Sequence, residues 1–64
     1  MVIQLIYLQP DGSRRTRTYR GVPPWSKSEM MRNFYAERTM YRGGQMIQLK
    51  GNERRVVAKF GEEF

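Results

Sequence analysis

The strongest constraint on the fold is a run of apolar residues near the N-terminus. Read as a β-strand, residues 2–9 are largely apolar on both faces, with Ile3, Leu5 and Tyr7 on one and Val2, Ile6 and Leu8 on the other. A strand that is apolar on both sides usually lies in the middle of its sheet. We therefore expect residues 2–9 to form a central strand.

A turn and a second strand are expected to follow. Pro10-Asp11-Gly12-Ser13 is a strong turn signal, because proline presets φ and glycine accepts a positive φ. Residues 14–20 then combine arginine and threonine with Tyr19. Threonine and tyrosine favour strands, and arginines are typical of a solvated edge. The first twenty residues therefore predict a β-hairpin.

The next segment predicts a helix. Pro23 and Pro24 end the hairpin, because proline cannot continue a ladder. Ser26 and Glu29 have the spacing of a capping box, and Trp25 and Met30 that of a hydrophobic staple. We expect a helix over residues 27–42, stopped by a glycine cap at 43–44. Its predicted apolar face has an arginine at its centre and consists of Met30, Met31, Phe34, Tyr35, Arg38 and Tyr41.

Two strands complete the expected fold. Residues 45–50 predict a strand with Ile47 and Leu49 inward, and residues 54–60 one with Val56, Ala58 and Phe60 on one face. The fold class is α+β, with one amphipathic helix packed on one face of a small, mostly antiparallel sheet of three to four strands, in the order ββαββ. Residues 1–64 form a single small basic domain, and we expect the acidic tail, residues 61–64, to fray.

The composition argues against catalysis. The chain has no histidine and no cysteine, so the commonest general base and the usual metal ligands are missing. We predict no enzyme activity, no metal, no cofactor and no small-molecule substrate. The longest apolar run is far shorter than the roughly 20 residues of a membrane span, and no signal-peptide pattern is present. We therefore expect no membrane insertion and a cytoplasmic location.

The charge predicts an acidic partner. The formal net charge is +6, and nine of the twelve basic residues are arginines, which make planar contacts with carboxylates and phosphates. The candidate contact residues are Arg14, Arg15, Arg17, Tyr19, Arg20, Trp25, Tyr35, Arg38 and Arg42. A simpler interpretation also exists: the arginines keep an edge strand soluble, and Arg38 extends its charged end to the rim of the helix.

One segment resembles a known family. It begins with Val22-Pro23, continues with Met31-Arg32-Asn33 in the amphipathic helix, and ends with Gly43-Gly44 and the strand residues Met46, Ile47 and Leu49. This stretch, residues 22–49, resembles the CpcD-like phycobilisome linker domain. The resemblance implies a colourless linker seated in or at the mouth of a phycobiliprotein ring, peripheral at the thylakoid surface. Such a linker carries no bilin of its own, and its only relation to a cofactor would be contact with a bilin of its partner.

Two other partners remain open at the level of sequence. The same arginines suit a groove for single-stranded nucleic acid, with Tyr19 or Trp25 stacking on bases. A small virus-encoded protein that occludes a host partner would have the same features.

Overall fold

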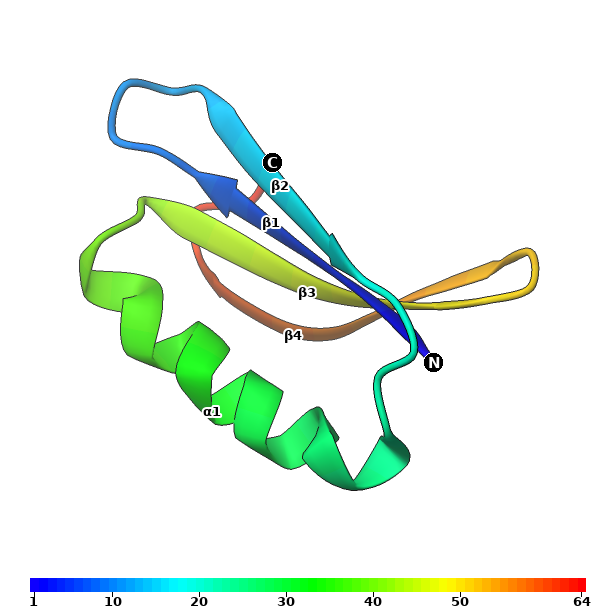
Figure 1. Ribbon diagram of the computed structural model, residues 1–64. Helices are drawn as coiled ribbons and strands as arrows, with labels where there is room; N and C mark the ends of the chain where they lie inside the picture. Colours follow the sequence, from blue (N-terminus) through cyan, green and yellow to red (C-terminus); the bar gives the residue numbers. More distant parts are fainter.

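The computed structural model describes all 64 residues and confirms the α+β class and the ββαββ order. Figure 1 shows the elements in chain order. They are β1 (Val2–Leu8), β2 (Arg14–Tyr19), the 3₁₀ turn η1 (Pro24–Ser26), α1 (Lys27–Ala36), the 3₁₀ turn η2 (Glu37–Thr39), β3 (Gly43–Lys50) and β4 (Glu53–Gly61).

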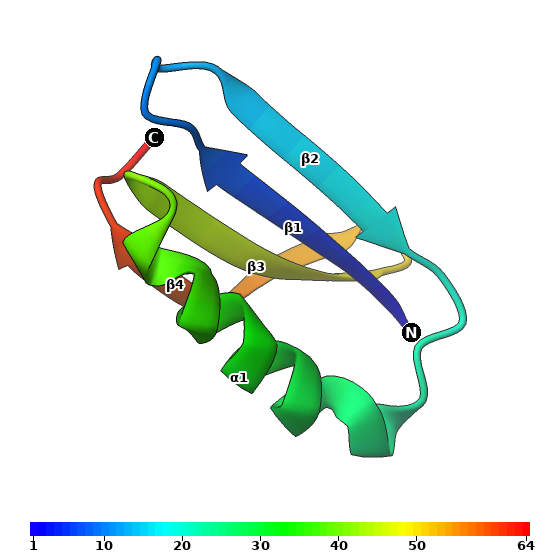
Figure 2. The same ribbon diagram turned by 60° about the vertical axis from the view of Figure 1, so that its left-hand side comes forward.

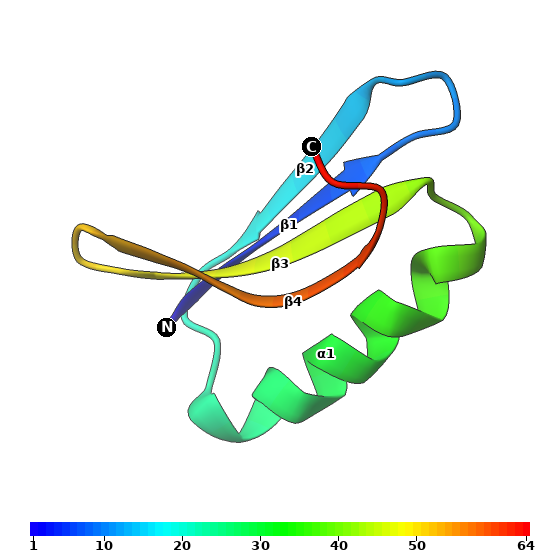
Figure 3. The same ribbon diagram turned by 180° about the vertical axis from the view of Figure 1, so that it is seen from behind.

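The four strands form one antiparallel sheet in the order β2-β1-β3-β4. As predicted, β1 is central and β2 is an edge strand, all six residues of which are exposed. The helix α1 packs on one face of this sheet (Figures 1 and 3). It is the longest helix of the chain, and no helix is both long and apolar enough to cross a bilayer.

The core lies between α1 and the face of β1 that carries Ile3, Leu5 and Tyr7. Phe34 is the one buried residue of α1, and its ring centroid lies 5.7 Å from that of Tyr7. The core also contains Val22, Met46 and Ala58. None of these residues belongs to β2, so the helix covers the other three strands and leaves this edge open.

A β-bulge changes the predicted faces of the last two strands. The register shifts between Met46 and Ile47, so that Ile47 pairs with Val56 while Met46 pairs with Ala58. An extra residue in one strand interrupts its alternation. The alternation in the sequence predicts Val56 on the same face as Ala58 and Phe60. Because of the bulge, Val56 lies on the opposite face, so this prediction is wrong. Ile47 is fully buried, but it lies on the face away from the helix.

The start of the helix is as predicted, but its signals act differently. The Ser26 side chain makes no capping bond and instead donates to the Pro23 carbonyl oxygen at 2.8 Å. Trp25 is 80% exposed, so little of its ring can pack on Met30. The predicted capping box and hydrophobic staple are therefore wrong. The turn η1 places Ser26 with α-like dihedrals, which do not suit an N-cap.

The helix also ends six residues before the predicted Arg42, and Gly43-Gly44 is not its cap. Both glycines begin β3, where they pair with β1 and β4. A Cβ at Gly43 would lie 2.3 Å from the Glu62 carbonyl oxygen, and one at Gly44 2.5 Å from the Phe60 ring. These positions need glycine because neighbouring groups approach too closely for any side chain.

The C-terminal residues turn back across the sheet (Figure 3). Gly61 ends β4, the Glu62 amide donates to the Arg42 carbonyl, and the Gln45 side chain donates to the carbonyl oxygen of Phe64. The guanidinium of Arg14 lies 5.2 Å from the centroid of the Phe64 ring. The tail thus has partners on β2 and β3. Fraying concerns its motion and stays a prediction.

Candidate functional site

Three of the predicted contact residues lie along one face of the edge strand β2. Arg15, Arg17 and Tyr19 pair with Tyr7, Leu5 and Ile3, so their side chains lie on the same face of the sheet as the helix. The helix does not reach over β2 (Figure 2). We call Arg15, Arg17 and Tyr19 the β2 wall.

A groove runs between this wall and α1. Its volume is about 290 Å³. The residues that line it, which we call the β2 groove, are Leu5, Tyr7, Arg17, Tyr19, Met30, Asn33, Phe34 and Glu37. Its floor is apolar, its β2 side carries a cation, and its helix side carries an amide and a carboxylate. The groove is therefore suited to an occupant with both polar and apolar groups.

The polar groups of the groove influence one another. Burial, and then the nearby Glu37 carboxylate, raise the pKa of the Tyr7 phenol above its ordinary value, so the phenol stays protonated. A hydrogen bond with the Tyr19 phenol raises the pKa of the Arg17 guanidinium. Arg17 therefore presents a fixed positive charge at the mouth of the groove at any physiological pH.

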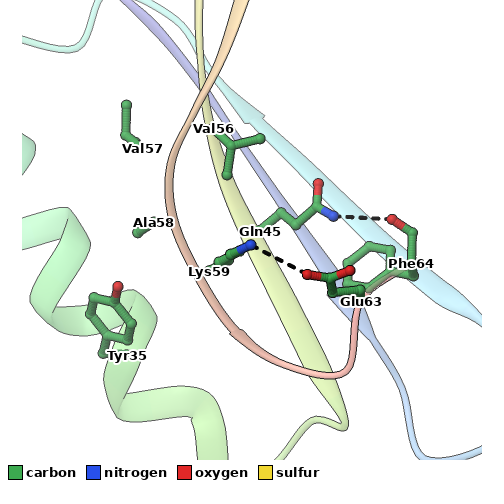
Figure 4. A pocket seen from close by; sticks show the side chains of 8 residues that line it. All are labelled: Tyr35, Gln45, Val56, Val57, Ala58, Lys59, Glu63 and Phe64. Carbon is green, nitrogen blue, oxygen red and sulfur yellow. Dashed lines mark hydrogen bonds and ion pairs between the residues drawn. The ribbon is translucent and has the colours of Figure 1, made fainter.

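A second hollow lies at the opposite edge of the sheet, beside β4 (Figure 4). Its volume is about 540 Å³, and its lining consists of Tyr35, Gln45, Val56, Val57, Ala58, Lys59, Glu63 and Phe64. Figure 4 shows Gln45 bonded to Phe64 and Lys59 paired with Glu63 along its rim. The hollow is open, and its charges are already matched.

The other predicted contact residues lie apart from the β2 wall. Arg14 is on the opposite face of β2, and Arg20 follows the strand. Trp25 projects from η1. Tyr35 lines the hollow beside β4. Arg38 lies in η2 and is exposed, which agrees with the interpretation that its charged end reaches the rim of the helix. Its guanidinium donates to the Tyr35 carbonyl at 2.9 Å. The structure therefore brings together three of the nine.

The ninth, Arg42, is used inside the molecule. Its Nε and one terminal nitrogen donate to the two carboxylate oxygens of Glu62 at 2.9 and 3.0 Å. This two-point contact lowers the pKa of the Glu62 carboxyl and raises that of the Arg42 guanidinium. Arg42 thus anchors the C-terminal tail to the start of β3.

We expect Glu62→Gln to lower the free energy of unfolding at pH 7. The pKa of Glu62 is lower in the folded chain than in the unfolded one, so the pair stabilises the fold above the unfolded value of about 4.3. That stabilisation is lost as the pH falls through the folded value. Urea denaturation should therefore show a difference between wild type and variant at pH 7 that disappears in acid.

The matched control is Glu63→Gln. Glu63 pairs with Lys59 at 3.4 Å, and its side chain is 84% exposed. Because exposed ion pairs of this kind contribute little, Glu63→Gln should leave stability unchanged at both pH values. Equal losses in the two variants would mean that the two-point contact of Glu62 has no special role.

Most of the basic residues have no carboxylate partner. The molecule contains two ion pairs, Arg42–Glu62 and Lys59–Glu63, which leave ten of the twelve basic residues unpaired. Eight of these ten are arginines. Some lie outside the predicted set, at the projecting tip of the β3–β4 hairpin, where Lys50, Arg54 and Arg55 are exposed (Figure 1). The positive charge is therefore available to a partner.

Comparisons with known proteins were made for the whole chain. No protein-family model, no curated protein and no solved structure matches the chain. The β2 groove and its surroundings present positive charge, hydrogen-bond donors and a shallow apolar surface. No three acidic side chains come together in a group that could hold a metal ion.

Sequence reasoning missed most of the groove lining. The sequence places Tyr7 on a strand face and Phe34 on the apolar face of the helix, and neither pattern indicates a groove. Strand alternation already places Arg15, Arg17 and Tyr19 on one face, so the wall could have been found. The groove could not, because no local signal says which strand the helix leaves uncovered.

Proposed function

We propose that this chain is a non-catalytic binding module that docks on an acidic protein complex. One observation carries the proposal: eight of nine arginines lie at the surface without a carboxylate partner. Surface charge of one sign accelerates association with an oppositely charged partner and selects against like-charged ones. In a domain this small, binding also stabilises the fold, because only the folded chain presents the surface.

The kind of acidic complex is proposed from the sequence. Residues 22–49 resemble the CpcD-like phycobilisome linker domain, and biliprotein surfaces are acidic. The chain would then be a linker in or at the mouth of a phycobiliprotein ring, in the cytoplasm at the thylakoid surface. It would attach no bilin, and its exposed Trp25 and Tyr35 would add aromatic contacts beside the arginines.

The test is co-purification with purified phycobiliprotein at low salt. We expect the wild-type chain to bind and to shift the absorption of the partner's bilins. The charge-reversed variant Arg15→Glu/Arg17→Glu should bind at least tenfold more weakly, because it replaces attraction with repulsion on the β2 wall. Arg32→Glu, a single reversal on the exposed side of α1, is the control and should bind nearly as well. Absence of both co-purification and a spectral shift would contradict the linker assignment.

A small nucleic-acid-binding protein is the second candidate, favoured by one observation. Trp25 is 80% exposed and lies between Arg20 and Lys27 in the chain, an arrangement suited to stacking on an unpaired base beside its phosphates. The β2 groove suits nucleic acid less well, because the Glu37 carboxylate borders it. An acidic protein can place its own donors and apolar groups there.

Titration with a single-stranded oligonucleotide at two salt concentrations separates the candidates. Phosphate-driven binding weakens steeply with salt, in proportion to the number of phosphates neutralised. If the oligonucleotide binds more tightly than the biliprotein at physiological salt, the nucleic-acid assignment replaces the first. Trp25 is the sole tryptophan, so its fluorescence reports directly on stacking.

A further inference from the structure

The edge strand β2 has free backbone groups whose direction follows from the register. The Gln9 amide donates to the Ser13 carbonyl at 2.8 Å, which fixes the phase of the hairpin ladder. In an antiparallel pair, hydrogen-bonded positions alternate with non-bonded ones. Arg15, Arg17 and Tyr19 therefore bond to β1. The N–H and C=O groups of Arg14, Thr16 and Thr18 are directed outward from the sheet.

The neighbouring contacts agree with this phase. The Leu8 carbonyl accepts from the Arg42 amide, on the β3 side of β1, and Met1 exchanges bonds with Val22 on the β2 side. Odd-numbered residues of β1 thus bond toward β2 and even-numbered ones toward β3. Because no element lies outside β2 (Figure 2), its outward groups have no partner in the chain.

From this we infer that the outer edge of β2 binds an extended acidic segment of the partner as a fifth strand. This inference rests on the proposed function and specifies how the chain recognises its acidic partner. A row of unpaired backbone groups is a template for another strand. Strand addition uses the backbone for affinity and alternate side chains for specificity.

Charge decides which strand can be added. Arg15 and Arg17 project on the helix side of β2, Arg14 projects on the other, and none of them has an ion-pair partner. Acidic side chains on the helix side of an added strand would lie beside Arg15 and Arg17 and reach the mouth of the β2 groove. Cross-strand pairs of opposite charge stabilise a sheet, and like-charged pairs destabilise it. A second copy of β2 would bring arginine against arginine, so an acidic strand is favoured over self-pairing.

The first experiment removes one outward donor without touching the ladder to β1. Thr16→Pro deletes an amide directed to solvent, and proline is tolerated on the outer side of an edge strand. Thr16→Val keeps the amide and is the matched control. The probe is a short capped peptide in which glutamate alternates with threonine, and its lysine–threonine counterpart is the negative control. We expect Thr16→Pro to bind the acidic peptide about tenfold more weakly than Thr16→Val, and the basic peptide not to bind.

A second measurement uses the wild-type chain and does not depend on the folding of the proline variant. Amide hydrogen exchange followed by NMR should show fast exchange at Thr16 and Thr18 in the free protein and slow exchange with the acidic peptide bound. Arg15 and Arg17 should be protected in both states, because β1 already holds their amides.

Several results would overturn strand addition. Peptide binding without protection of Thr16 and Thr18, or equal binding by the proline and valine variants, leaves the proposed function standing but places the partner elsewhere. Protection of these amides in the free protein, together with a dimer in sedimentation, would assign the edge to a second copy. Binding of the oligonucleotide alone, or of no acidic probe at all, removes both this inference and the function on which it rests.

Discussion

Phe34→Ala is expected to remove a large part of this protein's stability at 25 °C. The Phe34 side chain is 1% exposed, and no other residue of α1 is buried. Its ring centroid lies 4.9 Å from that of Phe60 and 5.7 Å from that of Tyr7, so this one side chain connects the helix to β1 and β4. Truncating a buried phenylalanine costs about 3–5 kcal/mol.

That loss equals the whole stability at the lower end of the range expected for the chain. Native domains have about 0.05–0.15 kcal/mol of stability per residue, which for this length gives roughly 3–10 kcal/mol. Urea denaturation followed by circular dichroism measures the change. Tyr35→Ala is the control, because it removes the adjacent ring of the same helix from a position that is 37% exposed. We expect it to cost about 1 kcal/mol. Similar losses in both variants would show that the helix is not held through Phe34.

The sequence predicts the element order, the central position of β1 and the edge position of β2, because these depend on local signals, but it leaves the positions of β3 and β4 in the sheet open. An apolar character on both faces places β1 in the centre of the sheet. Proline and glycine at residues 10–12 close the first hairpin, and its arginines mark the edge. Each of these signals lies within about ten residues of the feature that it determines, so the element order follows from the sequence alone.

The face of the sheet that the helix occupies could not be predicted, because it depends on contacts between residues distant in the sequence. Ile3, Leu5 and Tyr7 lie on one face of β1 and Val2, Ile6 and Leu8 on the other, so Gln4 on the second face is the one local difference between them. The choice depends on neighbours distant in sequence. Gly44 lies beside Tyr7 and opposite Phe60, where its missing side chain makes room for the Phe34 ring. The β2 groove exists only once that choice is made, which is why its lining escaped sequence analysis.

The bulge and the tail show the same limit. Strand alternation predicts Val56 on the face of Ala58, but one extra residue in β4 reverses it. The acidic tail predicts fraying, which stays a prediction, but nothing in its local sequence indicates that Glu62 bonds to Arg42 and Phe64 to Gln45. Neither partner is within reach along the chain. Pairings between distant residues are therefore the part of this fold that local patterns do not reveal.

Gly44→Ala is expected to destabilise the fold by about 1–3 kcal/mol, although alanine is normally a benign replacement. Its Cβ would lie 2.5 Å from the Phe60 ring and 3.1 Å from the Phe34 ring. Both rings belong to the packed aromatic cluster of the core, so neither can move aside without disturbing the other contacts. Thermal and urea denaturation measure the loss.

Gly51→Ala separates steric crowding from backbone conformation. Gly51 has a φ of +59°, but a Cβ there would meet nothing within 4 Å. Its replacement should therefore cost about 1–2 kcal/mol from the left-handed conformation alone. Because no side chain is crowded there, shortening a side chain elsewhere in the molecule should not reduce that cost. The loss at Gly44, which has no positive φ, should depend on its neighbours.

A double-mutant cycle decides whether the Phe60 ring is the cause at Gly44. Phe60→Leu removes the atoms that a Cβ at Gly44 would meet, so the two substitutions together should cost clearly less than the sum of the single losses. Gly51→Ala combined with Phe60→Leu should be additive, because the two residues share no contact. Additivity at Gly44 as well would mean that the Phe60 ring is not the cause of the loss, which would then lie with the Phe34 ring or the backbone.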